Sequence, residues 1–197
     1  MDGSPLTRIA GWSAYGSAAA TILTLLTGIL FFTIGQPFGT LEDFSAVLQV
    51  VFMIPVAIAL HRLLPSTTRS VSLVAAGVGI LGMLISAIGQ GLLVLGRIDY
   101  PTSTKFFPAG LAIGSWLLVV CSLARINGFF PNGLARAGSI AGVGYFVTVA
   151  GFLWGGQESP VFYLGGFALG IGYPVWALWL GRLFLAGTLH PGIASST

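Results

Sequence analysis

Few side chains in this 197-residue chain are able to do chemistry, because only 7% of its residues are charged. There is one cysteine, Cys121, and there are two histidines, His61 and His190. The remaining candidates are polar residues that recur at the same end of successive apolar segments. We take six of them as a candidate ligand-binding cluster: Glu42, Gln49, Gln90, Arg97, Glu158 and Tyr163.

The residue types in this cluster suit acid–base work or ligand binding. A carboxyl group that loses its water has a raised pKa and is able to act as a general acid. Candidates for that role are Glu42, Asp43 and Glu158, with Gln49, Gln90 or Tyr163 holding a substrate. In the simpler alternative, the two amides bond each other or a backbone carbonyl and only hold helices together. The sequence leaves both interpretations open.

The sequence lacks the residues that a haem site, a Schiff base or a metal site would need. A haem held between helices needs histidines that face each other, but His61 ends one apolar segment and His190 lies in the polar tail. The only lysine, Lys105, falls in a predicted loop, which argues against a Schiff base at membrane depth. No spacing of His, Cys and carboxylates fits a metal site. We therefore expect no cofactor and no metal.

The segments that carry these residues are long and uncharged. Residues 161–181 form a run of 21 residues without a charge, which as a helix spans roughly 31 Å, the thickness of a bilayer's hydrocarbon core. Runs that long, without alternation, favour helices over a barrel. The sequence predicts an all-α, polytopic membrane bundle of three antiparallel hairpins in one domain, residues 1–197. Its six spans are 9–34, 44–64, 70–96, 106–124, 134–154 and 161–186.

Charge predicts the orientation of these spans. One side of the predicted bundle holds Arg8, Arg62, Arg69, Arg125, Arg136 and Arg182. The other side holds Arg97 and Lys105 together with Glu42, Asp43, Asp99 and Glu158. Because basic residues mark the cytoplasmic side, both termini are predicted to be cytoplasmic. The basic residues are scattered singly at helix ends, which excludes a nucleic-acid surface.

Glycine pairs one helical turn apart predict close helix packing. They lie at positions 110 and 114, 138 and 142, and 166 and 170. Small residues at this spacing let two helix backbones approach each other in lipid. Contacts within one bundle are the favoured interpretation, and self-association through these faces is the alternative.

Several segments resemble a large group of bacterial integral membrane proteins that is catalogued as a domain of unknown function. The resemblance is carried by LARAGSIAGVGYFVTVAGFLWG, the helix end PVWALWLGRLFL, RIAGWSAYGSAAATILTLLTGILFF and LEDFSAVLQVVFMIPVAIALHRLL. It implies six spans in a bacterial cytoplasmic membrane. It implies no reaction, substrate or catalytic residue.

Three classes of function follow from these observations. The favoured one is a protein without a catalytic site that binds lipid or a small ligand, or that serves as an accessory subunit of a membrane complex. The first alternative is a membrane-embedded enzyme that acts on an apolar substrate, such as a lipid or isoprenoid, at the outer interface. The second is a passive channel or transporter. The expected partners are membrane lipids and other membrane-protein subunits.

Overall fold

The computed structural model describes residues 4–189, and helices take up 88% of them with no strand. Six helices are long and apolar enough to cross a membrane. Their bounds are α1 Pro5–Ile34, α2 Phe38–Leu63, α3 Arg69–Val94, α5 Ala109–Ile126, α6 Asn132–Gly155 and α7 Pro160–Ala186. Short elements fill the connections: α4 Tyr100–Ser103 and the 3-10 helices Ser66–Thr68, Thr104–Phe106 and Gly156–Glu158.

Local sequence explains where the helices begin and end. Pro5 occupies the first turn of α1, where its missing N–H costs nothing, and the Ser4 hydroxyl accepts a hydrogen bond from the Thr7 N–H. Glycines with positive φ end α6 and α7, at Gly156 (φ 64°) and Gly187 (φ 64°). Only glycine adopts this conformation without a steric penalty, so each helix stops there.

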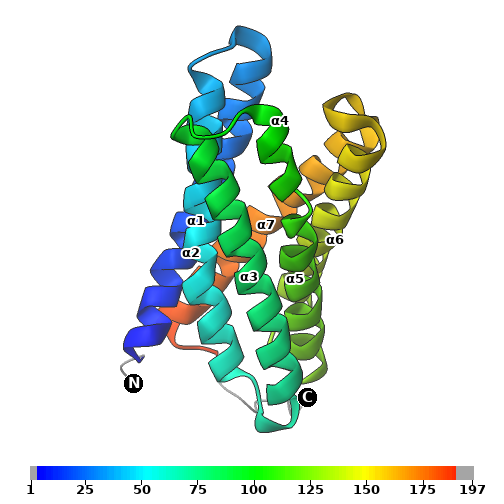
Figure 1. Cartoon of the computed structure of the whole chain (residues 1–197). Coiled ribbons are helices and arrows are strands. Elements are labelled where there is room, and N and C mark those ends of the chain that lie inside the picture. Colours follow the sequence, from blue (N-terminus) through cyan, green and yellow to red (C-terminus); the bar gives the residue numbers. More distant parts are fainter. Residues whose placement is uncertain (1–3, 190–197) are drawn as a thin grey trace.

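The six long helices form one bundle (Figure 1), and their contacts close it into a ring. In order around the ring they are α1, α2, α3, α5, α6 and α7, and α7 packs back against α1. Connections between α1 and α2, α3 and α5, and α6 and α7 lie at one end of the ring, and the described chain ends lie at the other (Figure 1).

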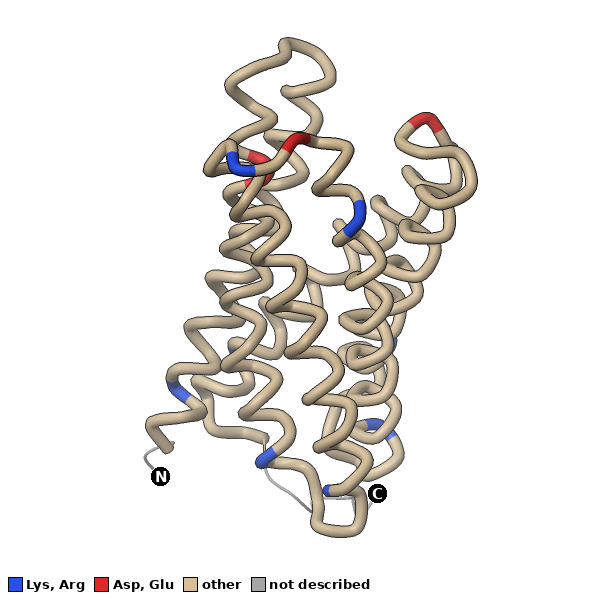
Figure 2. Tube along the Cα trace, viewed as in Figure 1, with Lys and Arg blue, Asp and Glu red and all other residues tan. Residues whose placement is uncertain are grey.

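The carboxylates of the described residues lie at one end of the bundle and most of the arginines lie at the other (Figure 2). We call one end acidic, because the described carboxylates lie there: Glu42, Asp43, Asp99 and Glu158. The opposite, basic end carries the arginines at the starts of α1, α3 and α6 and near the ends of α2, α5 and α7. Between the two ends the outer surface exposes large apolar side chains, such as Leu26 (55%), Leu81 (59%) and Phe167 (61%). A surface of this kind is suited to lipid contact.

The core is concentrated in the basic half of the ring. The largest fully buried side chains include Met53, Met83, Trp116, Tyr173 and Trp176. The rings of Trp116 and Trp176 meet edge to face with centroids 6.0 Å apart. The basic half of the bundle is therefore filled with side chains from α2, α3, α5 and α7.

Glycines bring α6 and α7 into backbone contact. A Cβ on Gly144 would lie 2.6 Å from the Leu169 nitrogen, and one on Gly165 would lie 2.8 Å from the Thr148 Cα. Of the predicted pair on α7, Gly170 packs against the side chain of Leu25 of α1 and not, as the glycine spacing predicts, against a helix backbone. The expectation was also wrong for Gly166, where a Cβ would meet nothing within 4 Å. Gly165, one residue earlier on the helix, makes the close contact instead.

Candidate functional site

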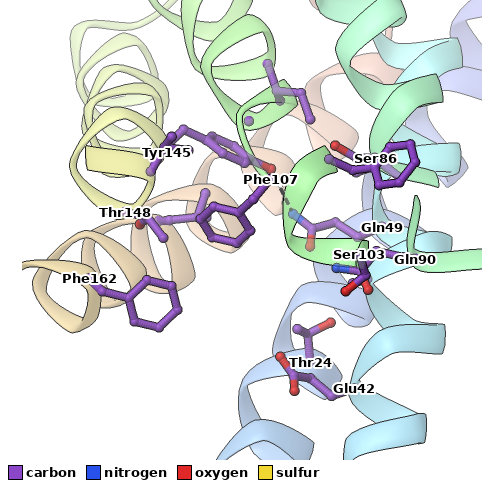
Figure 3. Close-up of a pocket in the computed structure, with 17 residues that line it drawn as sticks. Thr24, Glu42, Gln49, Ser86, Gln90, Ser103, Phe107, Tyr145, Thr148 and Phe162 are labelled. Atoms are coloured by element: carbon purple, nitrogen blue, oxygen red, sulfur yellow. Dashed lines mark hydrogen bonds between the residues drawn. The ribbon is translucent and has the colours of Figure 1, made fainter. Parts of the chain in front are cut away.

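A cavity of about 240 Å³ occupies the acidic half of the ring (Figure 3). All six long helices contribute side chains to its wall. The polar groups of the wall are Thr24, Glu42, Gln49, Ser86, Gln90, Ser103, Tyr145 and Thr148. Three phenylalanines supply apolar surface: Phe106, Phe107 and Phe162. A concave, mainly apolar space with a few convergent polar groups is the usual form of a ligand site.

Helical spacing brings the polar groups to the cavity. Residues three or four apart share a face of a helix, and the polar residues of four helices have that spacing. They lie at positions 17, 21 and 24 of α1, 42, 45 and 49 of α2, 86 and 90 of α3, and 145 and 148 of α6. Each helix thus turns one short polar stripe inward and leaves its apolar face outside.

Gln49 is held by a network of hydrogen bonds at the end of the cavity that lies nearest the basic end of the bundle. It is 7% exposed, and its Nε2 donates to the Tyr145 hydroxyl at 3.3 Å. The Ser17 hydroxyl donates to the main-chain carbonyl oxygen of Gln49 at 2.9 Å and lies 2.5 Å from the Tyr173 hydroxyl. These contacts link α1, α2, α6 and α7, which makes this end of the cavity rigid.

Nearer the acidic end, α1 and α2 are joined through Ser45. Its hydroxyl lies 2.8 Å from that of Thr24 and donates to the Glu42 carbonyl oxygen at 2.8 Å. The side chain of Glu42 is half-buried and reaches the cavity from this level. No lysine, arginine or histidine lines the cavity, so its wall supplies no cation to this carboxyl group.

Gln90 brings an unused acceptor to the same cavity. Its Oε1 is buried and has no hydrogen-bond partner among the described residues. A buried polar atom without a partner costs free energy, on the order of 1–3 kcal/mol. Because Gln90 lines the cavity, a rotation of its amide would bring this acceptor within reach of a donor group on a ligand.

The cavity does not continue toward the basic end. Tyr173 and Trp176 lie one and two turns beyond its last α7 residue, Leu169, and are fully buried. On α5, Trp116 lies just past Ile113 in the same direction. These three aromatic side chains fill the ring between the cavity and the basic end. The cavity is therefore a pocket and not a pore in this conformation.

Three of the six predicted cluster residues line the cavity: Glu42, Gln49 and Gln90. The other three lie outside it. Arg97 is exposed beyond the end of α3, and Glu158 is exposed in the 3-10 helix before α7. Tyr163 is 40% exposed, with its ring 6.4 Å from that of Phe32. The sequence places these residues at the correct end of the bundle, but in connections or on the outer face.

Gln49 and Gln90 face the same cavity without a hydrogen bond between them. The partner of Gln49 is Tyr145 instead. Counted from the connection between α2 and α3, Gln90 lies further along its helix than Gln49 does. The two amides therefore stand at different heights, and α6 supplies the group that meets Gln49.

Sequence reasoning missed the hydroxyl groups of the wall: Thr24, Ser86, Ser103, Tyr145 and Thr148. A signal was present in the spacing of serine and threonine on the first span, at positions 17, 21 and 24. Hydroxyl side chains also bond to their own helix, as Thr148 does with the Gly144 carbonyl at 2.7 Å. Their presence in an apolar segment therefore gives no clear sign of a site.

Asp99 is the ionisable group of the acidic end whose environment is clearest. Its carboxylate caps α4 by accepting a hydrogen bond from the Thr102 N–H at 3.0 Å. Hydrogen bonding from Thr102 holds the pKa of Asp99 below its usual range. Because Asp99 is fully exposed and does not line the cavity, its role is to cap this short helix.

Two further results bear on the nature of the site. Residues 4–189 contain no group of three His, Cys, Asp or Glu side chains that is arranged to hold a metal ion. Comparisons with protein-family models, with curated proteins and with solved structures find no match. The resemblance to a bacterial membrane-protein family therefore stays a prediction.

Proposed function

We propose that this chain is an integral membrane protein that binds a small amphiphilic ligand in the cavity of its acidic half. The observation that carries the proposal is the convergence of polar groups from four inward stripes on one cavity, including the unpartnered Oε1 of Gln90. Polar groups at membrane depth are expensive unless they meet each other, water or a ligand.

The wall indicates the chemistry of the ligand. Gln90 and Glu42 offer acceptors, which favours a ligand with a hydroxyl, amide or amino donor. Phe106, Phe107 and Phe162 favour an apolar body beside that donor. The cavity is smaller than the roughly 300–1,000 Å³ of drug-sized sites. A small molecule fits this description, and so does the polar head of a lipid whose chain stays outside.

The proposal includes a topology. We place the six long helices across a bacterial cytoplasmic membrane as three antiparallel hairpins, with both termini in the cytoplasm. Six arginines at the basic end against Arg97 and Lys105 at the other support this orientation. The cavity then faces the outer side of the membrane.

The test is identification of what the protein carries. The protein is solubilised in a mild detergent, and small molecules released on denaturation are identified by mass spectrometry. We expect a species that is enriched in the wild type and lost from Gln90→Leu. The matched control is Gln36→Leu, which removes an exposed amide outside the cavity. Absence of an enriched species, or equal enrichment in both variants, would refute ligand binding at this cavity.

A second candidate is an enzyme that acts on an apolar substrate, with Glu42 as the acid. The observation in its favour is that Glu42 lines the cavity beside Gln49 and Gln90, which are suited to hold a substrate. Glu158 and Tyr163, named with it from sequence, lie outside the cavity wall. Glu42→Gln separates the two functions. In a binding protein the variant carries the same species as the wild type, in smaller amount because Glu42 is one of its acceptors. In an enzyme the variant carries unreacted substrate, which differs in mass from the product found with the wild type.

A further inference from the structure

Two hollows lie on the outer surface, away from the cavity described above, one at the basic end and one along α6 and α7. The first hollow, of about 310 Å³, lies between α5 and α6. Its polar groups are Ser122 and Arg125 from the end of α5, and Arg136 and Ser139 from the start of α6. Two guanidinium groups and two hydroxyl groups from two helices thus border one space.

Within residues 4–189, no carboxylate at the basic end balances these arginines. Arg125 and Arg136 are both exposed, and the four carboxylates in residues 4–189 all lie at the acidic end (Figure 2). Guanidinium groups bind phosphate through paired N–H donors, and serine hydroxyls add further donors. The hollow therefore has the chemistry of a phosphate site.

An apolar groove of about 420 Å³ adjoins this hollow. It runs along α6 and α7 and is lined by side chains such as Phe167, Ile171 and Val175. The two hollows share Ile140 in their walls, and Ala137 of the groove follows Arg136 of the hollow directly in sequence. The groove extends toward the acidic end as far as Leu164. A cationic hollow and an apolar groove thus lie next to each other along α6, with Ile140 between them.

We propose that these two hollows form a binding site for one anionic phospholipid. Arg125 and Arg136 hold the phosphate, with Ser122 and Ser139 as additional donors, and an acyl chain lies in the groove of α6 and α7. Basic pockets between membrane helices bind anionic lipid head groups. The groove beside Ile140 distinguishes this site from a general attraction of basic residues to an anionic surface, because it supplies space for an acyl chain next to the head group.

The experiment compares lipid binding by native mass spectrometry of the detergent-solubilised protein. Dioleoyl phosphatidylglycerol is added in competition with dioleoyl phosphatidylcholine, which has the same chains but no net charge. We expect the wild type to prefer phosphatidylglycerol, and the Arg125→Gln/Arg136→Gln variant to lose about tenfold or more of that preference. The control variant, Arg62→Gln/Arg69→Gln, removes the same charge from the same end and should keep it.

Further arms separate lipid from other anions. Dihexanoyl phosphatidylglycerol carries the same head group on short chains and should bind at least tenfold more weakly than the dioleoyl lipid, because it fills less of the groove. Inorganic phosphate at millimolar concentration should not displace the dioleoyl lipid. Equal loss of preference in both double variants would overturn the site, as would chain-independent binding or displacement by phosphate. A melting temperature measured for each variant confirms that it is folded.

Discussion

The contact between α6 and α7 allows a sharp comparison of two adjacent glycines. Gly165 and Gly166 lie on the same helix, and each is replaced by alanine. A Cβ on Gly165 would lie 2.5 Å from the Thr148 Oγ1 and 2.8 Å from its Cα. At Gly166 a Cβ would meet nothing within 4 Å. The two variants gain the same methyl group and differ only in what it touches.

The magnitude follows from the atoms that the methyl group would meet. At Gly165 these include the Thr148 backbone, which has no rotamer to change, so the helices must separate. Overpacking of this kind costs about 1–3 kcal/mol. Alanine also gains up to about 1 kcal/mol over glycine in helix propensity, but this gain is common to both variants. Gly165→Ala should therefore be less stable than Gly166→Ala by about 1–3 kcal/mol.

The assay is reversible unfolding in mixed micelles of a mild detergent and SDS, followed by circular dichroism. Gly166→Ala should unfold at the same or a higher SDS fraction than the wild type, and Gly165→Ala at a lower one than Gly166→Ala. Equal stability of the two variants would refute the close approach of α6 and α7. A greater loss in Gly166→Ala would show that the other face of α7 makes the contact.

The remaining predictions concern the network and the topology. Tyr145→Phe removes the hydroxyl group that accepts a hydrogen bond from Gln49, and it should lower the free energy of unfolding by about 1 kcal/mol in the same unfolding assay. The control Tyr163→Phe, at an exposed ring, should leave the free energy of unfolding unchanged. In a cysteine-free background, a membrane-impermeant thiol reagent added to intact cells should label Glu158→Cys and not Arg136→Cys, and the reverse result would contradict the proposed orientation.

The sequence predicts the helices well because hydropathy and length determine them. The predicted span 161–186 corresponds to α7, Pro160–Ala186, and 134–154 corresponds to α6, Asn132–Gly155. The larger error is at the second span, predicted from residue 44, whereas α2 begins at Phe38. Because of the charges at positions 42 and 43, the predicted span begins too late in the sequence. In the structure these carboxylates lie within the first two turns of the helix and are half-buried.

The candidate site could be predicted only in part, because hydropathy gives the depth of a residue and not the direction in which it points. Glu42 and Gln49 are seven residues apart, so one inward-facing position predicts the other. Arg97 and Glu158 lie in connections, where no helical period applies. Tyr145 was missed because a tyrosine in an apolar segment is common, and its role depends on the height of Gln49 on another helix.

The contrast between the two halves of the bundle supports a ligand site more strongly than any single residue does. The basic half packs its interior with large side chains such as Trp116 and Trp176, whereas the acidic half keeps a cavity of about 240 Å³. Each half holds one buried polar atom without a hydrogen-bond partner among the described residues, Trp176 Nε1 in the basic half and Gln90 Oε1 in the acidic half, but only Gln90 lines the cavity. Leucine at position 90 would remove that unpaired acceptor, so Gln90→Leu should leave the ligand-free protein as stable as the wild type or more stable. A residue that costs stability and faces a cavity is typical of a functional site, where stability is given up for binding.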